Sequence, residues 1–190
     1  NQGFNDHRVL SNYAVILRDL GNLQEAELSY RKAIELKPDY AEAYSNLGGI
    51  LNDLGKLQDA ELSTRKAIEL KPDYAMAYYN LGNILRDLGK LQDAESSTRK
   101  AIELNPNLEK TYSNLGSILR DMGNLKDSEI YIRKAIELKP DLANAHSNLG
   151  SILKDLGKLK DAELSTRKAI ELNPDEASAN YNLGIIYFEN

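Results

Sequence analysis

A 34-residue repeat runs through this 190-residue chain and restricts its fold more than any other sequence feature. The dipeptide Leu-Gly, a single proline and the hexapeptide Arg-Lys-Ala-Ile-Glu-Leu each recur at this interval. The Leu-Gly pairs begin at Leu47, Leu81, Leu115, Leu149 and Leu183; the prolines are Pro38, Pro72, Pro106, Pro140 and Pro174; the hexapeptides begin at Arg31, Arg65, Arg99, Arg133 and Arg167. Such self-similarity predicts a stack of similar supersecondary units rather than one core made by distant segments.

We divide the chain into five full repeats and a half repeat within one solenoid spanning residues 1–190. The full repeats are 7–40, 41–74, 75–108, 109–142 and 143–176, and the half repeat is 177–190. The first six residues form a lead-in, where Phe4 and Asn5 stand in place of Pro-Asp. Because solenoids normally end in polar caps, we expect a fragment of a longer protein, or an end that is buried against another copy.

Each repeat is expected to form two helices. In the second repeat, apolar residues within 44–54 follow the three-to-four residue spacing of one buried helical face. A second apolar set, which includes Leu62, runs through 57–70. Gly55 separates the two helices, since the residue after a helix often adopts the left-handed conformation, and Pro72 ends the second helix. The short connections predict antiparallel hairpins.

Two local features are expected to fix how the helices begin and how closely they pack. Asp39 and Asp73 precede first helices, at positions suited to a side-chain cap. Gly48 is expected to face Ala60 and Ala67, so that the two helix backbones of the hairpin can approach closely. The sequence therefore predicts capped helices and a small-residue contact inside each hairpin.

The 34-residue period, with its Leu-Gly pair, two alanines and terminal proline, resembles the tetratricopeptide repeat family. The resemblance covers essentially the whole chain. It implies an all-α fold, a right-handed superhelix of antiparallel helix pairs, in which the first helices line a concave groove. The leading hypothesis is therefore a non-enzymatic scaffold or adaptor whose groove holds an extended segment of a partner protein.

An unbroken column of asparagines would line this groove. Its members are Asn12, Asn46, Asn80, Asn114, Asn148 and Asn182. A carboxamide carries donors and an acceptor, and with helices about 10 Å apart one asparagine would meet roughly every third residue of an extended peptide. The column is similar to one in the repeat domain of the O-linked N-acetylglucosamine transferase. The alternative, which can hold at the same time, is that each asparagine bonds the backbone of a neighbouring helix.

Two charged rows accompany the asparagine column. The basic row is Arg18, Arg86, Arg120 and Lys154, interrupted by Asn52, and the acidic row is Asp19, Asp53, Asp87, Asp121 and Asp155. We expect the two rows to pair with each other between adjacent repeats, which leaves the groove nearly neutral. On the opposite face, glutamate–arginine pairs at i, i+4, from Glu27–Arg31 onward, are expected to stabilise the second helices.

Part of a second family pattern is also present. In the members that clamp the carboxylate tail of chaperones, lysines stand where this chain has Ser11, Ser45, Tyr79, Ser113 and Ser147. Lys110 and Asn83 match parts of that pattern, and Tyr79 lies beside the column. We include these three residues among the groove candidates, but the incomplete set does not favour a chaperone-tail receptor.

Composition argues against several other functions. The net charge of −5 disfavours a nucleic-acid partner, and no run approaches the roughly 20 apolar residues of a membrane-spanning helix. The chain has no cysteine, which fits a cytoplasmic protein. His7 and His146 are the only histidines, so we expect no metal, no cofactor and no catalytic activity. His146 replaces a helix tyrosine and is expected to serve packing.

Two alternative functions stay open. The half repeat ends in an apolar cluster, which would mediate end-to-end self-association: Leu183, Ile185, Ile186, Tyr187 and Phe188. In addition, arrays of this near-identical kind look like those fused to bacterial glycosyl- or sulfotransferases, so the chain could be the substrate-presenting arm of such an enzyme.

Overall fold

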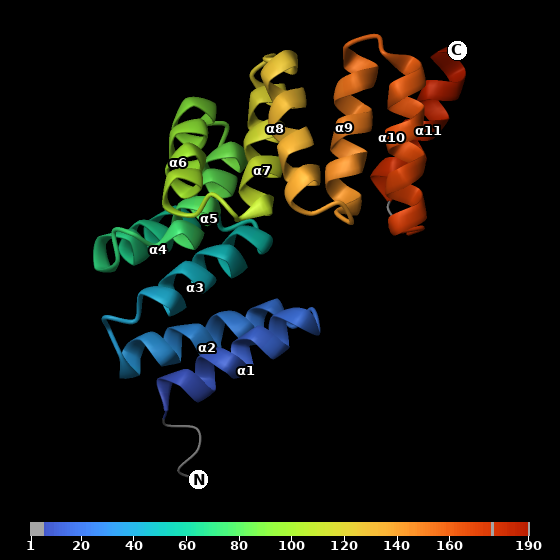
Figure 1. The fold of residues 1–190 in the computed structure, drawn as a ribbon. Helices are drawn as coiled ribbons and strands as arrows, with labels where there is room; N and C mark the ends of the chain where they lie inside the picture. Colours follow the sequence, from blue (N-terminus) through green and yellow to red (C-terminus); the bar gives the residue numbers. More distant parts are fainter. Residues whose placement is uncertain (1–5, 176, 190) are drawn as a thin grey trace. The chain divides into compact units, whose positions relative to one another are not determined.

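The computed structural model describes residues 6–175 and 177–189, and this part of the chain folds into eleven helices (Figure 1). The helices are α1 His7–Asp19, α2 Leu23–Leu36, α3 Ala41–Asp53, α4 Leu57–Leu70, α5 Ala75–Asp87, α6 Leu91–Leu104, α7 Glu109–Asp121, α8 Leu125–Leu138, α9 Ala143–Asp155, α10 Leu159–Leu172 and α11 Ala177–Glu189. None of the described residues forms a strand. The all-α prediction is confirmed. Phe4 and Asn5 lie outside the described residues.

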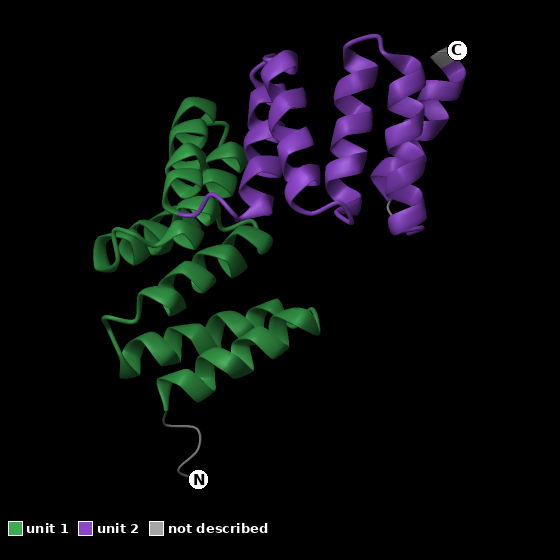
Figure 2. Ribbon diagram, viewed as in Figure 1, with its two compact units in different colours: residues 1–104 green, residues 105–190 purple. Residues whose placement is uncertain are grey.

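Each odd-numbered helix from α1 to α9 packs against the helix that follows it, and these pairs are the predicted hairpins. Neighbouring hairpins stack through contacts such as α2 with α3 and α3 with α5. The chain forms two compact units, residues 1–104 and residues 105–190, which we call unit 1 and unit 2 (Figure 2). Unit 1 contains α1–α6 and unit 2 contains α7–α11.

The turn inside each hairpin depends on a glycine in the left-handed region. Gly55 has φ +74°, and its N–H donates to the Asn52 carbonyl at 2.9 Å. The next N–H, of Lys56, donates to the Leu51 carbonyl at 2.8 Å. This pair of hydrogen bonds is the Schellman motif, which satisfies the last carbonyls of the helix. The prediction that glycine ends the first helix is confirmed here.

The predicted aspartate caps are wrong. Helices α3 and α5 have Tyr40 and Tyr74 at their N-caps, and neither helix receives a side-chain cap bond. The turn after the proline is longer than the sequence suggested and places Asp39 two residues before the helix. The backbone carbonyl of Asp39, rather than its carboxylate, accepts the N–H of Ala41 at 3.1 Å.

The second helix of each hairpin buries a narrower face than predicted. Ala60, Thr64 and Ala67 are fully buried in α4 and follow a three-to-four residue spacing. Leu62, which was predicted to be buried, is 68% exposed. Two residues correspond to about 200° of rotation around a helix, so Leu62 points away from the face that Ala60 occupies. The prediction for Leu62 is therefore wrong.

The two helices of a hairpin meet at a glycine. A Cβ atom added to Gly48 would overlap the hydroxyl oxygen of Thr64 and lie 3.2 Å from the carbonyl oxygen of Ala60. Gly150 faces Thr166 in the same way in unit 2. The sequence had assigned Ala67 as a second partner of Gly48, but Thr64 takes that place. The close approach itself is confirmed.

Replacement of Gly48 by alanine should destabilise the protein by about 1–3 kcal/mol, because the new methyl group overpacks against Thr64. The neighbouring Gly49→Ala is the matched control, since a Cβ there meets only Arg18 Nη1, at 4.0 Å. That change should be neutral or stabilise the helix by up to about 1 kcal/mol. Urea denaturation followed by circular dichroism measures both. Equal effects of the two substitutions would contradict the close-contact explanation, and Thr64→Ala should rescue Gly48→Ala.

Candidate peptide-binding groove

The odd-numbered helices of each unit carry the asparagine column and the charged rows, and we call the surface that they form within a unit its helix-A face. In α3 the side chains of Glu42, Asn46 and Asn52 and the backbone at Gly49 are partly exposed, whereas Ser45 is buried. Their i, i+4 and i+7 spacing places them on one side of the helix. The helix-A face comprises α1, α3 and α5 in unit 1, and α7, α9 and α11 in unit 2.

In unit 1 the asparagines make contacts inside the protein. The amide nitrogen of Asn80 donates to both the carbonyl and the hydroxyl oxygen of Ser45, each at 3.1 Å. Burial raises the pKa of Tyr30 to about 12, although a hydrogen bond with Asn46 partly opposes the shift. Asn12 is exposed on α1. Asn80 therefore follows the alternative in which an asparagine binds a neighbouring helix.

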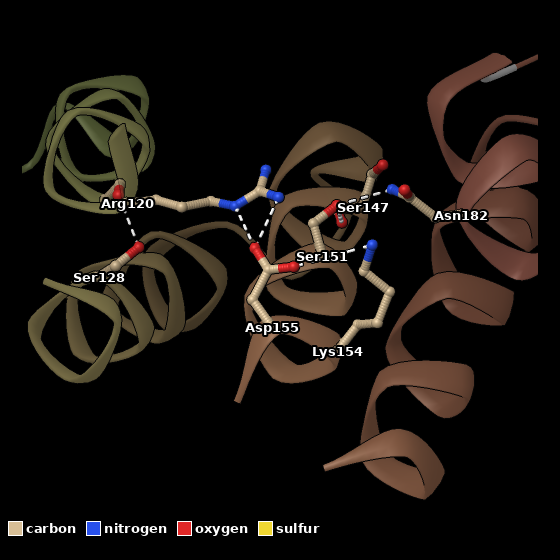
Figure 3. A network of polar contacts seen from close by, with 8 residues as sticks. Arg120, Ser128, Ser147, Ser151, Lys154, Asp155 and Asn182 are labelled. Carbon is tan, nitrogen blue, oxygen red and sulfur yellow. Dashed lines mark hydrogen bonds and ion pairs between the residues drawn. The ribbon is translucent and has the colours of Figure 1, made fainter. Parts of the chain in front are cut away.

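Unit 2 repeats this arrangement with serine hydroxyls as acceptors (Figure 3). The Asn148 amide nitrogen donates to Ser117 at 3.2 Å, and that of Asn182 donates to Ser151 at 2.6 Å. Asn114, on α7, is only 7% exposed. Ser117 and Ser151 had no predicted role. Each serine lies 31 residues before its asparagine, which is nearly the length of one repeat. This spacing is the signal in the sequence that could have identified them.

The charged rows pair across adjacent repeats in unit 1, as predicted. Arg18 Nη2 lies 2.9 Å from Asp53 Oδ2. Where Asn52 interrupts the basic row, its amide nitrogen donates to Asp87 at 2.8 Å. An asparagine in place of a basic residue at position 52 therefore keeps the link to the next repeat and removes only the positive charge.

Unit 2 shows the same pairing at its centre (Figure 3). Arg120 Nη2 lies 2.7 Å from Asp155 Oδ2, and Lys154 Nζ lies 3.7 Å from the other carboxylate oxygen. The Lys154 side chain is only 18% exposed. Both cations of this unit's basic row are thus directed at one carboxylate.

The remaining groove candidates lie on two helices. Tyr79, Asn83 and Arg86 are partly exposed on α5, and Lys110 is exposed on α7. Tyr79 and Asn83 are four residues apart and Arg86 follows three later, so these three share one side of α5. Lys110 belongs to unit 2, whereas the other three residues belong to unit 1.

The apolar cluster on α11 divides into buried and exposed residues. Ile186 is fully buried and belongs to the core of unit 2, so it does not contribute to an exposed association surface. Leu183 and Ile185 are partly buried, whereas Tyr187 and Phe188 are 50% and 93% exposed. By the 34-residue period, Ile185 and Phe188 take the places of Ser151 and Lys154. The helix-A face therefore becomes apolar on α11.

Tyr187 is held against the preceding helix. Its hydroxyl group donates to Glu163 at 3.1 Å and accepts a hydrogen bond from Arg167. The Arg167 guanidinium also lies 5.6 Å from the centre of the Tyr187 ring. Of the exposed aromatic residues on α11, Tyr187 is thus engaged within unit 2.

The second helices carry a different set of charges. All five predicted glutamate–arginine pairs are present: Glu27–Arg31, Glu61–Arg65, Glu95–Arg99, Glu129–Arg133 and Glu163–Arg167. Glu61 also binds Lys90 of the next repeat at 2.7 Å. The pKa of Glu61 lies below its ordinary value chiefly because Lys90 donates a hydrogen bond to its carboxylate. Burial opposes this shift, and the hydrogen bond from Arg65 adds to it. Each such glutamate stabilises its own helix, and Glu61 also joins two repeats.

Comparison with known proteins identifies the family. A model described as TPR repeat matches residues 15–55, 48–89 and 150–190, which together make up more than half of the chain. Two models described as Tetratricopeptide repeat match residues 75–108 and 109–142. The chain belongs to the tetratricopeptide repeat family. It follows that the helix pairs form a tetratricopeptide solenoid and that the protein is an interaction scaffold.

Three solved structures illustrate the similarity. YrrB, described as a TPR protein with an unusual peptide-binding site, is 26% identical, with a TM-score of 0.65 over 93% of this chain and 91% of YrrB. A structure of MamA is 27% identical, with a TM-score of 0.69 over 86% of this chain and 96% of MamA. A thermophilic TPR protein from Thermus thermophilus, TTC0263, is 21% identical and shares the fold with a TM-score of 0.84 over 96% of this chain and 99% of its own. No curated protein sequence matches this tetratricopeptide repeat chain.

Two further observations bear on other kinds of function. Within residues 6–175 and 177–189, no group of three or more histidine, aspartate or glutamate side chains is placed to hold a metal ion. In the same part of the tetratricopeptide repeat chain, every helix is too short or too polar to cross a membrane.

Replacement of Glu61 by glutamine should lower the free energy of unfolding by about 1 kcal/mol at pH 7, since Arg65 and Lys90 lose a shared carboxylate. The folded-state pKa of Glu61 is lowered from 4.5, so its contribution is present above about pH 4.5 and is lost as the pH falls through the folded pKa. The difference between wild type and variant should therefore shrink on acidification. Urea denaturation at about pH 7 and at about pH 3.5, on either side of the ordinary glutamate pKa, measures it.

Glu69→Gln is the control for this experiment. Glu69 pairs with Lys66 on its own helix, and its side chain is 69% exposed. Its loss should change stability by less than about 0.5 kcal/mol. A similar loss in both variants, or a Glu61→Gln effect that does not change with pH, would argue against the inter-repeat role of Glu61.

Proposed function

We propose that this tetratricopeptide repeat protein binds an extended segment of a partner protein on its helix-A face. The observation that carries the proposal is the regular return of a carboxamide and a hydroxyl group along first helices that are partly exposed. YrrB, 26% identical to this chain, is described as having a peptide-binding site, which supports a peptide as the ligand. We propose no catalytic role for the chain.

The contacts of the asparagines indicate how such a segment would be held. The amide nitrogens of Asn80, Asn148 and Asn182 already donate to serines. Their remaining capacity is chiefly the amide oxygen, which accepts hydrogen bonds. The column would therefore accept N–H groups from the backbone of the partner. Because every peptide unit other than proline carries such a donor, this contact would tolerate many sequences.

The paired charges favour a ligand of low net charge. Arg18 and Arg120 are already bound to aspartates of the next repeat. A carboxylate tail would have to displace these aspartates, which offsets the gain from binding it. The proposed partner segment is therefore a largely neutral, extended stretch of chain rather than an acidic tail.

A peptide selected from a displayed random library against the wild-type chain provides the probe. Gly49→Arg in unit 1 and Ser117→Arg in unit 2 place a long side chain on the helix-A face, and a Cβ at Gly49 meets no close neighbour. The pair of changes should weaken the selected peptide at least about ten-fold in titration calorimetry, because it blocks the face sterically.

Leu62→Glu is the matched control, since Leu62 lies on a second helix and is 68% exposed. It should leave the affinity of the selected peptide unchanged. A peptide that is lost with Leu62→Glu and retained with the two arginine changes would place binding on the second helices and overturn the proposal.

Self-association is a second candidate, favoured by the exposed aromatic residues of α11. Tyr181 is 71% and Phe188 is 93% exposed. Tyr181→Lys with Phe188→Lys should reduce the average mass in sedimentation equilibrium at protein concentrations of about 100 μM, because such contacts are hydrophobic. The control is Leu28→Lys with Leu62→Lys, a pair of comparable exposure on second helices. A wild-type chain that is monomeric at that concentration would end this candidate.

A further inference from the structure

A cleft of about 600 Å³ lies within unit 2, away from the asparagine column and the charged rows. It opens between the second helices α8 and α10, and the first helix α9 forms its floor. The residues that line it are Arg133, Ile136, Glu137, His146, Leu149, Leu164, Ser165, Arg167, Lys168 and Glu171. Its volume falls in the range of pockets that bind small molecules, so an aromatic ring has room to enter.

The cleft combines an apolar interior with neutralised charges at its rim. Leu149 is 4% exposed at the floor, and Leu164, 71% exposed, stands at the rim. Lys168 is bound to Glu171 at 2.7 Å, and the other charged lining residues also have partners on their own helices. An uncharged, largely apolar group is therefore the chemistry that this lining complements.

The repeat itself shows which group that is. Three repeats earlier, in unit 1, nine of the ten lining positions hold the same residue type. These nine are Arg31, Ile34, Glu35, Leu47, Leu62, Ser63, Arg65, Lys66 and Glu69. The one position that differs is Tyr44, which corresponds to His146, and the two repeats between them carry Tyr78 and Tyr112. The fifth repeat thus keeps a lining that elsewhere accompanies a tyrosine, but lacks the tyrosine.

Two interactions of the equivalent tyrosines indicate where such a side chain extends. The hydrogen bond from Lys100 to Glu103 is the main reason that the pKa of Lys100 is raised, and the nearby phenol of Tyr78 contributes in the same direction. Lys100 corresponds to Lys168 in the cleft. In unit 2 the ring of Tyr112, which corresponds to His146, stacks on the ring of Tyr131 with 6.5 Å between their centres. Tyr131 corresponds to Ser165 of the cleft lining, so the tyrosine ring of this row extends over that part of the lining.

The imidazole of His146 is engaged elsewhere. Its Nε2 lies 2.9 Å from the carbonyl oxygen of Pro140. A carbonyl oxygen can only accept a hydrogen bond, so this nitrogen carries the proton. The imidazole is also shorter than a phenol, and it therefore leaves the space beside Lys168 without the ring that the other repeats supply.

We propose that this cleft binds an aromatic side chain of a partner protein, with tyrosine as the best fit. The incoming ring would take the place that Tyr44, Tyr78 and Tyr112 hold in the other repeats, over Leu149 and next to Lys168. The rim is preformed, because Arg167 is fixed by Glu163 and by the Tyr187 hydroxyl group. The site lies between second helices, so it is independent of a peptide on the helix-A face.

The probe for this site is 4-methylphenol, the analogue of the tyrosine side chain, titrated into the ¹⁵N-labelled chain and followed by NMR. Saturable shifts are expected for backbone amides around Ile136, His146 and Leu149. His146→Tyr should abolish these shifts, because the protein's own ring then fills the cleft. The variant should fold, since tyrosine stands at the same position in three other repeats, and circular dichroism checks this.

Tyr44→His provides a test by gain of function. It converts the equivalent position in unit 1 to the residue of the fifth repeat, and should add a second saturable set of shifts around Leu47 and Leu62. Cyclohexylmethanol is of similar size but is not aromatic, so it offers no ring face to attract the Lys168 ammonium group. It should bind the wild-type site at least about five-fold more weakly. The absence of saturable shifts with 4-methylphenol, or their persistence in folded His146→Tyr, overturns the proposal. Peptide binding on the helix-A face should be unaffected by His146→Tyr, so the two proposals fail separately.

Discussion

The close contact between the two helices of each hairpin is the constraint on which the other features of the repeat depend. At Gly48 the backbone of one helix lies against the Thr64 side chain of the other, with no room for a methyl group. Because the helices are held at this distance, the polar residues of the first helix and the ion pairs of the second fall on separate surfaces. The partition of each repeat into a helix-A face and an outer face thus follows from a contact in the interior.

The periodic features of the sequence predicted the parts of the structure that are themselves periodic. The helix pairs, the glycine turns and the pairing of the charged rows all depend on residue types that return every 34 positions. The prediction of which side of a helix each residue faces was less reliable. Leu62 and Ala67 are both apolar residues on one helix, and only the packed structure shows that Thr64 rather than Ala67 meets Gly48 and that Leu62 faces outward.

The remaining differences between prediction and structure arise largely where a polar residue can form its hydrogen bonds in more than one way. An aspartate after proline can cap a helix with its carboxylate or with its carbonyl, and the length of the turn decides for the carbonyl of Asp39. An asparagine on a helix surface can bind a ligand or a neighbouring serine, and the spacing between stacked helices brings Ser45 within reach of Asn80. In α11 apolar residues follow one another without a helical period, so the pattern could not show that Ile186 is buried while Phe188 is exposed.

The links between neighbouring repeats have a consequence for how such a chain can change in length. Arg18 binds Asp53 across 35 residues, and Glu61 binds Lys90 across 29 residues, so each link joins a repeat only to the one that follows. Insertion or loss of one whole 34-residue module would renew every link with an equivalent partner. Insertion of a single residue within a helix would shift the residues that form these links out of register. The architecture can therefore grow by duplication of its module at little cost to the contacts already present.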